Sequence, residues 1–230
     1  MIYLDNAATS FPKPEPVYRG MEDFVRASGA NPGRGGHRRA VEAEAMINDT
    51  RRLLARLLGA PRPERVIFGH NATDGLNMAI KGVLRPGDHA ITSVLEHNSV
   101  SRPLNQLEQD GVIALTRVPA TADHLIDPDE IARAFRPNTR LVALTHASNV
   151  TGTIQPAGAI GRIVRERGAL FLVDAAQSAG VVPIDCDRDG IDLLAFTGHK
   201  GLLGPTGTGG LVVGERADVH TWREGGTGGD

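Results

Sequence analysis

The sequence predicts an α/β fold in which helices flank a mainly parallel sheet. Two observations carry this prediction. Short apolar runs alternate along the 230 residues with longer segments whose apolar residues recur at helical spacing. The 28 glycines and 14 prolines stand mostly at the ends of the apolar runs, as short connections between strands and helices require.

The composition is that of an ordinary globular protein. Hydrophobic residues make up 40% of the chain and charged residues 23%, which is enough for a sizeable core. The formal net charge of −2, without a long basic run, argues against nucleic acid as the main partner. The single cysteine, Cys186, excludes a disulfide within the chain. The sequence has neither a secretory signal nor an apolar run near the roughly 20 residues of a membrane span, so we expect a cytoplasmic protein without a membrane partner.

The N-terminal part is expected to be mostly helical after a short extended segment. A helix can open at one of the prolines near residue 14 and run to about residue 28. A second helix is expected over residues 38–58, where a glycine ends the pattern. The glycine-rich loop at 29–37 is either a plain linker or a segment whose polar residues face a ligand. Those polar residues are Asn31, Arg34 and His37.

The rest of the chain alternates strands and helices. Strands are expected at 65–68, 88–94, 112–118, 141–144, 170–173, 191–196 and 210–213. Helices are expected at 76–84, 100–109, 127–135 and 157–167. Ligands of parallel sheets bind where the strands end. Because polar residues from independent segments all follow predicted strands, the sequence predicts one site, with the candidates Thr73, His97, Asn149, Asp174, Thr197, His199 and Lys200.

The turn before the helix at 76–84 is a candidate anion site. Thr73 and Asp74 stand where N-cap residues are expected. Free N–H groups and the positive end of the helix dipole would favour a phosphate there. Ordinary helix capping is the alternative, and the two are compatible.

Lys200 is the centre of the predicted chemistry. It follows an apolar strand and precedes a glycine-rich turn, so burial should lower the pKa of its amine and make it a nucleophile toward a carbonyl. A surface lysine in a glycine loop is the alternative. Asp174 ends the preceding strand. This pairing suits pyridoxal phosphate (PLP), because the lysine forms the Schiff base and the aspartate keeps the pyridine nitrogen protonated.

Two other polar residues allow two interpretations each. His97, just past a strand, is either a helix cap or a group that stacks on a ligand ring. Asn149 can donate a hydrogen bond to an anionic oxygen of a ligand, or its side chain can form hydrogen bonds within its own loop. The residues alone leave both alternatives open.

Six short motifs carry a family resemblance because they occur together and in order. They are Tyr3-Leu4-Asp5-Asn6-Ala7-Ala8-Thr9, Asn71-Ala72-Thr73-Asp74-Gly75, Glu96-His97-Asn98-Ser99, Ser148-Asn149-Val150-Thr151-Gly152, Val173-Asp174-Ala175-Ala176-Gln177-Ser178 and Thr197-Gly198-His199-Lys200. This set resembles the class V (fold type I) PLP-dependent enzymes, most closely their cysteine desulfurase and selenocysteine lyase branch. The resemblance covers nearly the whole chain.

The resemblance implies a role for each candidate residue and no metal. Lys200 would hold PLP as the internal aldimine, Asp174 would pair with the pyridine nitrogen, and Gln177 would bond the ring hydroxyl. His97 would stack on the ring and could relay protons. Asn149 would lie beside the ring hydroxyl and the substrate carboxylate. The phosphate would be held by Ala72, Thr73, Thr197 and His199, and by Thr227 from the neighbouring subunit of a homodimer.

The chain departs from this family in two ways. Family members continue into a small C-terminal domain that carries an arginine for the substrate carboxylate and a loop cysteine that accepts sulfur, and neither is in these 230 residues. Cys186 does not match the loop cysteine, and we expect it to be structural. The resemblance therefore implies that residues 1–230 are the large PLP-binding domain. Residues 1–30 would be the segment that normally packs near the small domain.

The expected function is PLP chemistry on an amino acid, most closely that of a cysteine desulfurase, which converts L-cysteine to alanine and transfers the sulfur to an enzyme cysteine. A sulfur-acceptor protein would be a further partner. Another class V aminotransferase, an epimerase or a selenocysteine lyase is the alternative within the family. A truncated, catalytically silent PLP-binding dimerisation domain is the alternative of another class.

Overall fold

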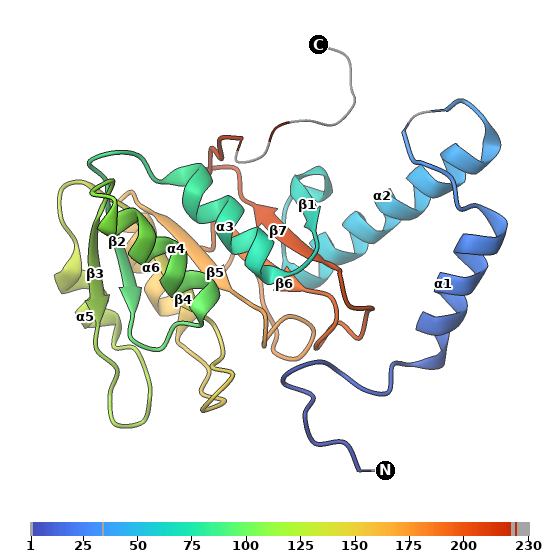
Figure 1. Cartoon of the computed structure of the whole chain (residues 1–230). Helices are drawn as coiled ribbons and strands as arrows, with labels where there is room; N and C mark the ends of the chain where they lie inside the picture. Colours follow the sequence, from blue (N-terminus) through green and yellow to red (C-terminus); the bar gives the residue numbers. More distant parts are fainter. Residues whose placement is uncertain (1, 34, 222–223, 225–230) are drawn as a thin grey trace.

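The structure is a computed structural model that describes residues 2–33, 35–221 and 224 (Figure 1). A seven-stranded sheet has the spatial order β1-β7-β6-β5-β4-β2-β3. Its strands are β1 (Val66–Gly69), β2 (His89–Ser93), β3 (Ala114–Val118), β4 (Thr139–Thr145), β5 (Leu170–Asp174), β6 (Leu193–Thr197) and β7 (Gly209–Val213). Only β7 runs against its neighbours among the described strands, so the others all point the same way. The predicted mainly parallel sheet is confirmed.

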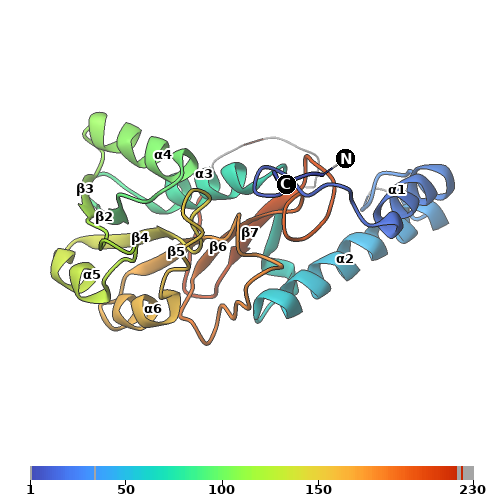
Figure 2. The same cartoon turned by 90° about the horizontal axis from the view of Figure 1, so that it is seen from below.

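Helices cover both faces of the sheet (Figure 2). Their bounds are α1 (Glu15–Ala27), α2 (Arg38–Leu58), α3 (Ala72–Val83), α4 (Asn98–Gln109), α5 (Pro128–Ala134) and α6 (Ala157–Glu166), with a short 3-10 helix η1 (Pro63–Arg65). One apolar core joins α3 and α4 to the sheet, and a second joins α2, α5 and α6 to the opposite face. Because both faces are covered, strands β2, β5 and β6 are buried along their whole length. This burial explains the nearly continuous apolar sequences of β5 and β6.

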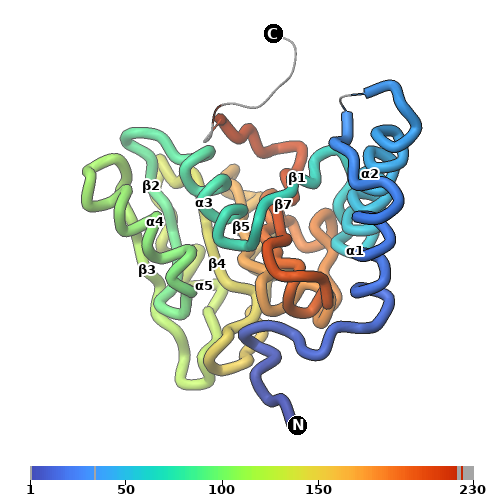
Figure 3. The backbone as a smooth tube through the Cα atoms, turned by 45° about the vertical axis from the view of Figure 1, so that its right-hand side comes forward, coloured from blue at the N-terminus to red at the C-terminus, as the bar shows by residue number. Residues whose placement is uncertain are grey.

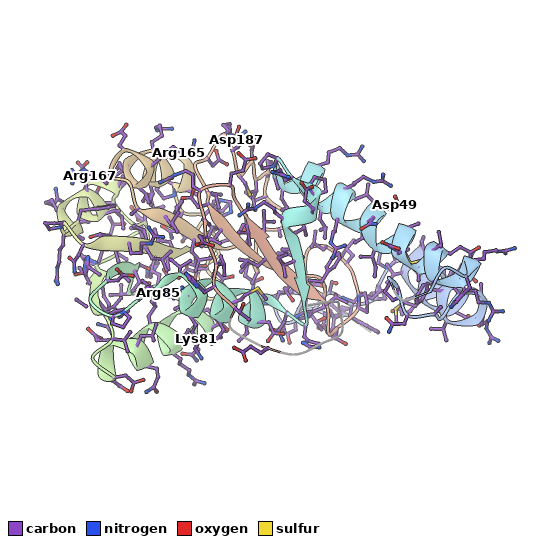
Figure 4. The ribbon with its side chains drawn as sticks, turned by 90° about the horizontal axis from the view of Figure 1, so that it is seen from above. Asp49, Lys81, Arg85, Arg165, Arg167 and Asp187 are labelled. Atoms are coloured by element: carbon purple, nitrogen blue, oxygen red, sulfur yellow. The ribbon has the colours of Figure 1, made fainter. Side chains whose placement is uncertain are left out.

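Several charged side chains of the connecting segments and helices lie at the outside of these layers (Figure 4). Seen from above, the labelled side chains of Arg165, Arg167 and Asp187 lie at the rim of the molecule, away from the sheet (Figure 4). Within the described residues, no helix has both the length and the apolar character that crossing a bilayer demands.

The predicted start of α3 is wrong. The helix begins at Ala72, and its N-cap is Asn71, whose side-chain oxygen accepts a hydrogen bond of 2.9 Å from the backbone N–H of Asp74. Thr73 and Asp74 therefore lie inside the first turn. Asn71 acts as the cap because it is the residue with an extended backbone, a conformation that aims its short side chain at the first free N–H groups.

Helices α1 and α2 stand together at the β1 end of the sheet, joined by the glycine-rich loop (Figure 3). The ring of His37 caps α2, because its Nδ1 accepts a hydrogen bond of 3.3 Å from the N–H of Ala40. Arg34 lies outside the described residues. A loop that only links the two helices therefore explains the presence of His37, because the ring serves as a helix cap and needs no ligand.

Candidate active site

An open pocket lies at the edge of the sheet where the parallel strands end. Its residues come from the segments that follow β1, β2, β4, β5 and β6. The lining consists of Asn71, Ala72, Thr73, Leu76, His97, Ser99, Thr145, Ala147, Asn149, Asp174, Ala176, Gln177, Thr197, His199 and Lys200. Nine of the ten residues predicted for the cofactor site are therefore brought together. The tenth, Thr227, lies outside the described residues.

Asp174 and Lys200 reach this pocket from adjacent strands. Asp174 is the last residue of β5, and it lies in register with Ala195 of the parallel strand β6. Lys200 follows three residues after the end of β6. The predicted pairing of an aspartate on one strand with a lysine beyond the next is therefore what the sheet produces.

Burial acts on both charged groups. The Asp174 side chain is 4% exposed, and the N–H of Ala176 donates a hydrogen bond of 2.9 Å to its Oδ1. Burial raises the pKa of the Asp174 carboxyl, against the effect of that N–H and of the nearby positive groups of His97 and Lys200. Burial also lowers the pKa of the Lys200 amine, which the charge of Asp174 partly offsets. The predicted direction for Lys200 is confirmed.

The N-terminus of α3 forms one wall of the pocket. The N–H groups of Ala72 and Thr73 belong to the first turn, where a helix supplies no acceptor of its own. The hydroxyl of Thr73 lies 2.8 Å from that of Ser99. These donors at the positive end of a helix suit an anion.

His199 adds a buried polar atom that lacks a partner. Among the described residues, its ring Nδ1 is buried without a hydrogen bond. Burial lowers the pKa of the imidazole, and the positive charges of Lys200 and Lys13 lower it further. A neutral imidazole with an unpaired buried nitrogen calls for a ligand atom or an ordered water at that position.

His97 is a helix cap, the first of its two predicted alternatives, and stacking on a ligand ring stays a prediction. Its Nδ1 accepts a hydrogen bond of 3.1 Å from the N–H of Ser99, so it caps α4, and the same residue lines the pocket. With Nδ1 acting as an acceptor, the proton of a neutral His97 ring is on Nε2. The capping bond thus fixes both the tautomer and the position of the ring.

Gln177 and Asn149 complete the predicted set. The Gln177 Nε2 donates a hydrogen bond of 3.0 Å to the carbonyl oxygen of Ala7, which brings the N-terminal segment to the side of the pocket. Asn149 is exposed in the loop after β4. Both side chains line the pocket, whereas Asn31 and His37 do not.

Several lining residues were not predicted as site residues. They are Asn71, Leu76, Ser99, Thr145, Ala147 and Ala176. Each lies within a few residues of a predicted one, so the available signal was position in the same strand-end segments. Their side chains are small or uncharged, and residue type alone did not mark them.

Cys186 lies apart from this site. It is 3% exposed, belongs to the core beneath α2, α5 and α6, and does not line the pocket. Burial, followed by the charges of nearby aspartates, raises the pKa of its thiol to about 12. A thiol that keeps its proton is a poor nucleophile, as expected for a structural cysteine.

Comparison with known proteins identifies the family. The model of the family described as aminotransferase class-V matches residues 2–229. The chain belongs to this family. It is 35% identical over 230 residues to the cysteine desulfurase IscS of Dictyoglomus turgidum, an alignment that covers 98% of this chain and 57% of that protein. The chain thus spans about half the length of the curated relatives it matches.

Solved structures agree with the fold. The apo structure of a cysteine desulfurase from Thermococcus onnurineus NA1 superposes with a TM-score of 0.91 at 33% identity, covering 98% of this chain and 57% of that one. A structure described as SspA in complex with cysteine gives a TM-score of 0.92 at 34% identity, covering 98% and 65%. The predicted fold class, the large domain of a fold type I PLP-dependent transferase, is confirmed.

PLP is the cofactor of the class-V aminotransferase family, and the pocket residues fit it. The N–H groups that open α3 and the unpaired Nδ1 of His199 suit a phosphate. The buried carboxylate of Asp174 suits a protonated ring nitrogen. In the same pocket, the amine of Lys200 is the group that can bond an aldehyde covalently.

Proposed function

We propose that this protein is a PLP-dependent enzyme of the cysteine desulfurase kind, which acts on L-cysteine and releases alanine. The observation that carries the proposal is the convergence of Lys200, Asp174 and the α3 N-terminus on one pocket. Relatives described as cysteine desulfurases, and the neighbour solved in complex with cysteine, support the choice of substrate.

Asp174 and Lys200 have different roles in this proposal. When bound, PLP supplies an electron sink for the pair of electrons left at the substrate's α-carbon. Asp174 holds the proton on the ring nitrogen, which its buried carboxylate favours once it faces a positive group. Lys200 anchors the cofactor and afterwards moves protons, because its lowered pKa leaves a larger share of the amine free to accept one.

Three other groups orient the cofactor in this proposal. The first N–H groups of α3, the Thr197 hydroxyl and the His199 ring bind the phosphate. Gln177 and Asn149 bond the ring hydroxyl. The ring of His97, fixed by its bond to Ser99, would stack on the cofactor ring and would be available for proton transfer through Nε2.

The sulfur acceptor in this proposal is a thiol other than Cys186. That thiol is buried outside the pocket and its pKa is raised to about 12, so it has neither the access nor the ionised form that sulfur transfer needs.

We extend the proposal to a cytoplasmic homodimer whose partner subunit supplies Thr227 to the phosphate site. The 230 residues would be the large domain of the enzyme, with the N-terminal 30 residues near a small domain and a sulfur-acceptor protein as a further partner.

The test begins with absorbance spectra of the purified protein mixed with PLP. The wild type should show a visible band that borohydride fixes as an adduct on Lys200, identifiable by peptide mass. Lys200→Ala should give no adduct, whereas the control Lys81→Ala, a change of an exposed lysine on α3, should behave as wild type. Without an adduct in folded wild type, the proposal fails.

Cysteine is then added together with an excess of a thiol reductant, which supplies the two electrons that release the transferred sulfur from its persulfide as sulfide. Sulfide and alanine are measured. Sulfide and alanine in equal amounts support the desulfurase. An adduct without turnover would favour the silent PLP-binding domain, and a keto acid product would favour an aminotransferase.

A further inference from the structure

The segment of residues 3–13 lies against the loop that carries Lys200. Figure 1 shows this segment crossing below the sheet, at the edge where the parallel strands end. Within the segment, the hydroxyl of Tyr3 donates to the carbonyl oxygen of Thr9, and the Tyr3 ring meets Phe11 edge to face at 5.5 Å. These contacts give the segment a defined shape without a helix or strand.

Most of the hydrogen bonds from this segment to the loop end on a single carbonyl oxygen. The carbonyl oxygen of His199 accepts hydrogen bonds from the Ser10 N–H (3.0 Å), the Ser10 hydroxyl (3.1 Å), the Thr9 hydroxyl (3.0 Å) and the Lys13 ammonium (2.6 Å). This carbonyl belongs to the peptide bond that joins His199 to Lys200. A carbonyl oxygen has two lone pairs, so four donors are more than hydrogen-bond satisfaction requires.

The ammonium group of Lys13 makes the shortest of the four bonds and the only charged one. Its other hydrogen bond, of 2.6 Å, goes to the hydroxyl of Ser10, so both acceptors are uncharged. Burial lowers the pKa of Lys13, and among the described residues no carboxylate opposes this shift. The positive charge of Lys13 is therefore directed at the peptide beside Lys200 instead of being neutralised by an ion pair.

The same charge reaches the cofactor side of the loop. Lys13 and Lys200 both lower the pKa of the His199 imidazole, so the ring lies within the electrostatic influence of two ammonium groups. His199 and Lys200 both line the pocket, and Lys13 does not. Lys13 can thus act on the cofactor through its neighbours without touching it.

We propose that Lys13 is a positioning residue of the cofactor site. Through the His199 carbonyl it fixes the peptide that carries Lys200, and its charge favours the binding of an anion beside His199. This inference rests on the proposed function, since it assumes PLP at Lys200. The alternative is that Lys13 only anchors the N-terminal segment to the domain.

Three variants distinguish these roles. Lys13→Met keeps the length of the side chain and removes the charge, Lys13→Arg keeps the charge, and Lys81→Met removes a charge from the exposed face of α3. Each protein is titrated with PLP to obtain the dissociation constant. The pH midpoint of the visible band of the Lys200-bound cofactor is recorded, together with the melting temperature of the cofactor-free protein.

A positioning role predicts a specific pattern. Lys13→Met should weaken PLP binding about tenfold, because a positive charge near His199 is lost. It should also shift the pH midpoint, because the peptide that carries Lys200 is no longer held by Lys13. Lys13→Arg should lie close to wild type, and Lys81→Met should match it. A merely structural anchor would lower the melting temperature and leave the midpoint in place.

Wild-type affinity and midpoint in Lys13→Met would overturn the inference, as would a change confined to melting temperature. These outcomes are distinct from failure of the proposed function. If wild type itself forms no band with PLP, the proposed function fails and the role of Lys13 fails with it. If wild type forms the band and Lys13→Met is indistinguishable from it, only the role of Lys13 is lost.

Discussion

Asp174 and Lys200 oppose each other's response to burial inside one pocket. The carboxylate of Asp174 raises the pKa of the Lys200 amine, and the ammonium of Lys200 lowers the pKa of the Asp174 carboxyl. Desolvation acts the other way on both groups and is the larger cause for each. Burial therefore disfavours the charged form of each group, and a positively charged ring nitrogen beside Asp174 would stabilise its ionised form.

Replacing Asp174 by Asn tests this relationship. The change removes the charge that would pair with the ring nitrogen, so we expect PLP to bind about 10- to 100-fold more weakly, the loss of one charge-assisted hydrogen bond. The pKa of Lys200 should fall further, because the charge of Asp174 that raises it is gone. Titration of the visible band with PLP at several pH values measures both effects.

Asp192→Asn is the matched control for that experiment. Asp192 is also buried, at the opposite edge of the sheet, where it bonds the N–H of Phe171 and the guanidinium of Arg216. Its replacement should lower the melting temperature and leave the PLP dissociation constant unchanged. Equal loss of PLP affinity in both variants would argue that Asp174 acts only through the fold.

Cys186 provides a second prediction. With a thiol pKa of about 12, about one part in 10,000 of the side chain is ionised at pH 8, so alkylation by iodoacetamide should be at least about 100-fold slower in the folded than in the unfolded protein. Cys186→Ala should retain any sulfide production that wild type shows with cysteine. Sulfide production that disappears in a folded Cys186→Ala protein would make this thiol the sulfur acceptor.

The sequence was informative about the site because the strands are parallel. Residues that follow parallel strands must meet at one edge of the sheet, so Asp174 and Lys200 could be paired before their distance was known. Thr73 and His97 reach the same edge for the same reason. Each could be found in the sequence because it is a polar residue that follows an apolar run. The positions of polar residues along the sequence and the parallel order of the strands therefore predict the same site.

The contacts that the sequence did not predict depend on backbone geometry. Asn71, Thr73 and Asp74 are all suitable caps by residue type, and only the extended backbone of Asn71 decides among them. The bond from Lys13 to His199 spans 186 residues and ends on a backbone carbonyl, an acceptor that every residue has. No residue pattern can identify such a partner.

A third prediction concerns the packing of α3 on the sheet. Gly75 has no side chain where α3 crosses β7, and a Cβ there would lie 2.5 Å from the carbonyl oxygen of Gly210. Gly75→Ala should therefore destabilise the protein by about 1 to 3 kcal/mol. Gly20→Ala is the control, because it lies in α1 with nothing within 4 Å. The control should be neutral or should stabilise by up to about 1 kcal/mol in urea denaturation.

The carboxyl group of Glu96 is buried next to the pocket although the residue as a whole is partly exposed. Its Oε1 accepts a hydrogen bond of 2.5 Å from the hydroxyl of Ser93, and its Oε2 has no partner among the described residues. Burial, together with the charge of Asp174, raises the pKa of Glu96 to about 8 against the hydrogen bonds from Ser93 and the backbone of Thr145. Glu96 is therefore uncharged in the folded protein at neutral pH.

The stability consequence of Glu96 has a definite sign. Between about pH 4.5 and pH 8 the unfolded chain loses the Glu96 proton while the folded protein keeps it, so this residue lowers the free energy of unfolding as the pH rises through that window. Glu96→Gln cannot titrate, and relative to wild type it should gain about 2 to 4 kcal/mol between pH 5 and pH 8. Urea denaturation of both proteins at the two pH values measures the gain, and effects common to both cancel. Glu44→Gln, on the exposed side of α2, is the control. If the stability difference between Glu96→Gln and wild type is the same at both pH values, then Glu96 is already ionised in the folded protein. The inference that its buried carboxyl is uncharged would then be wrong.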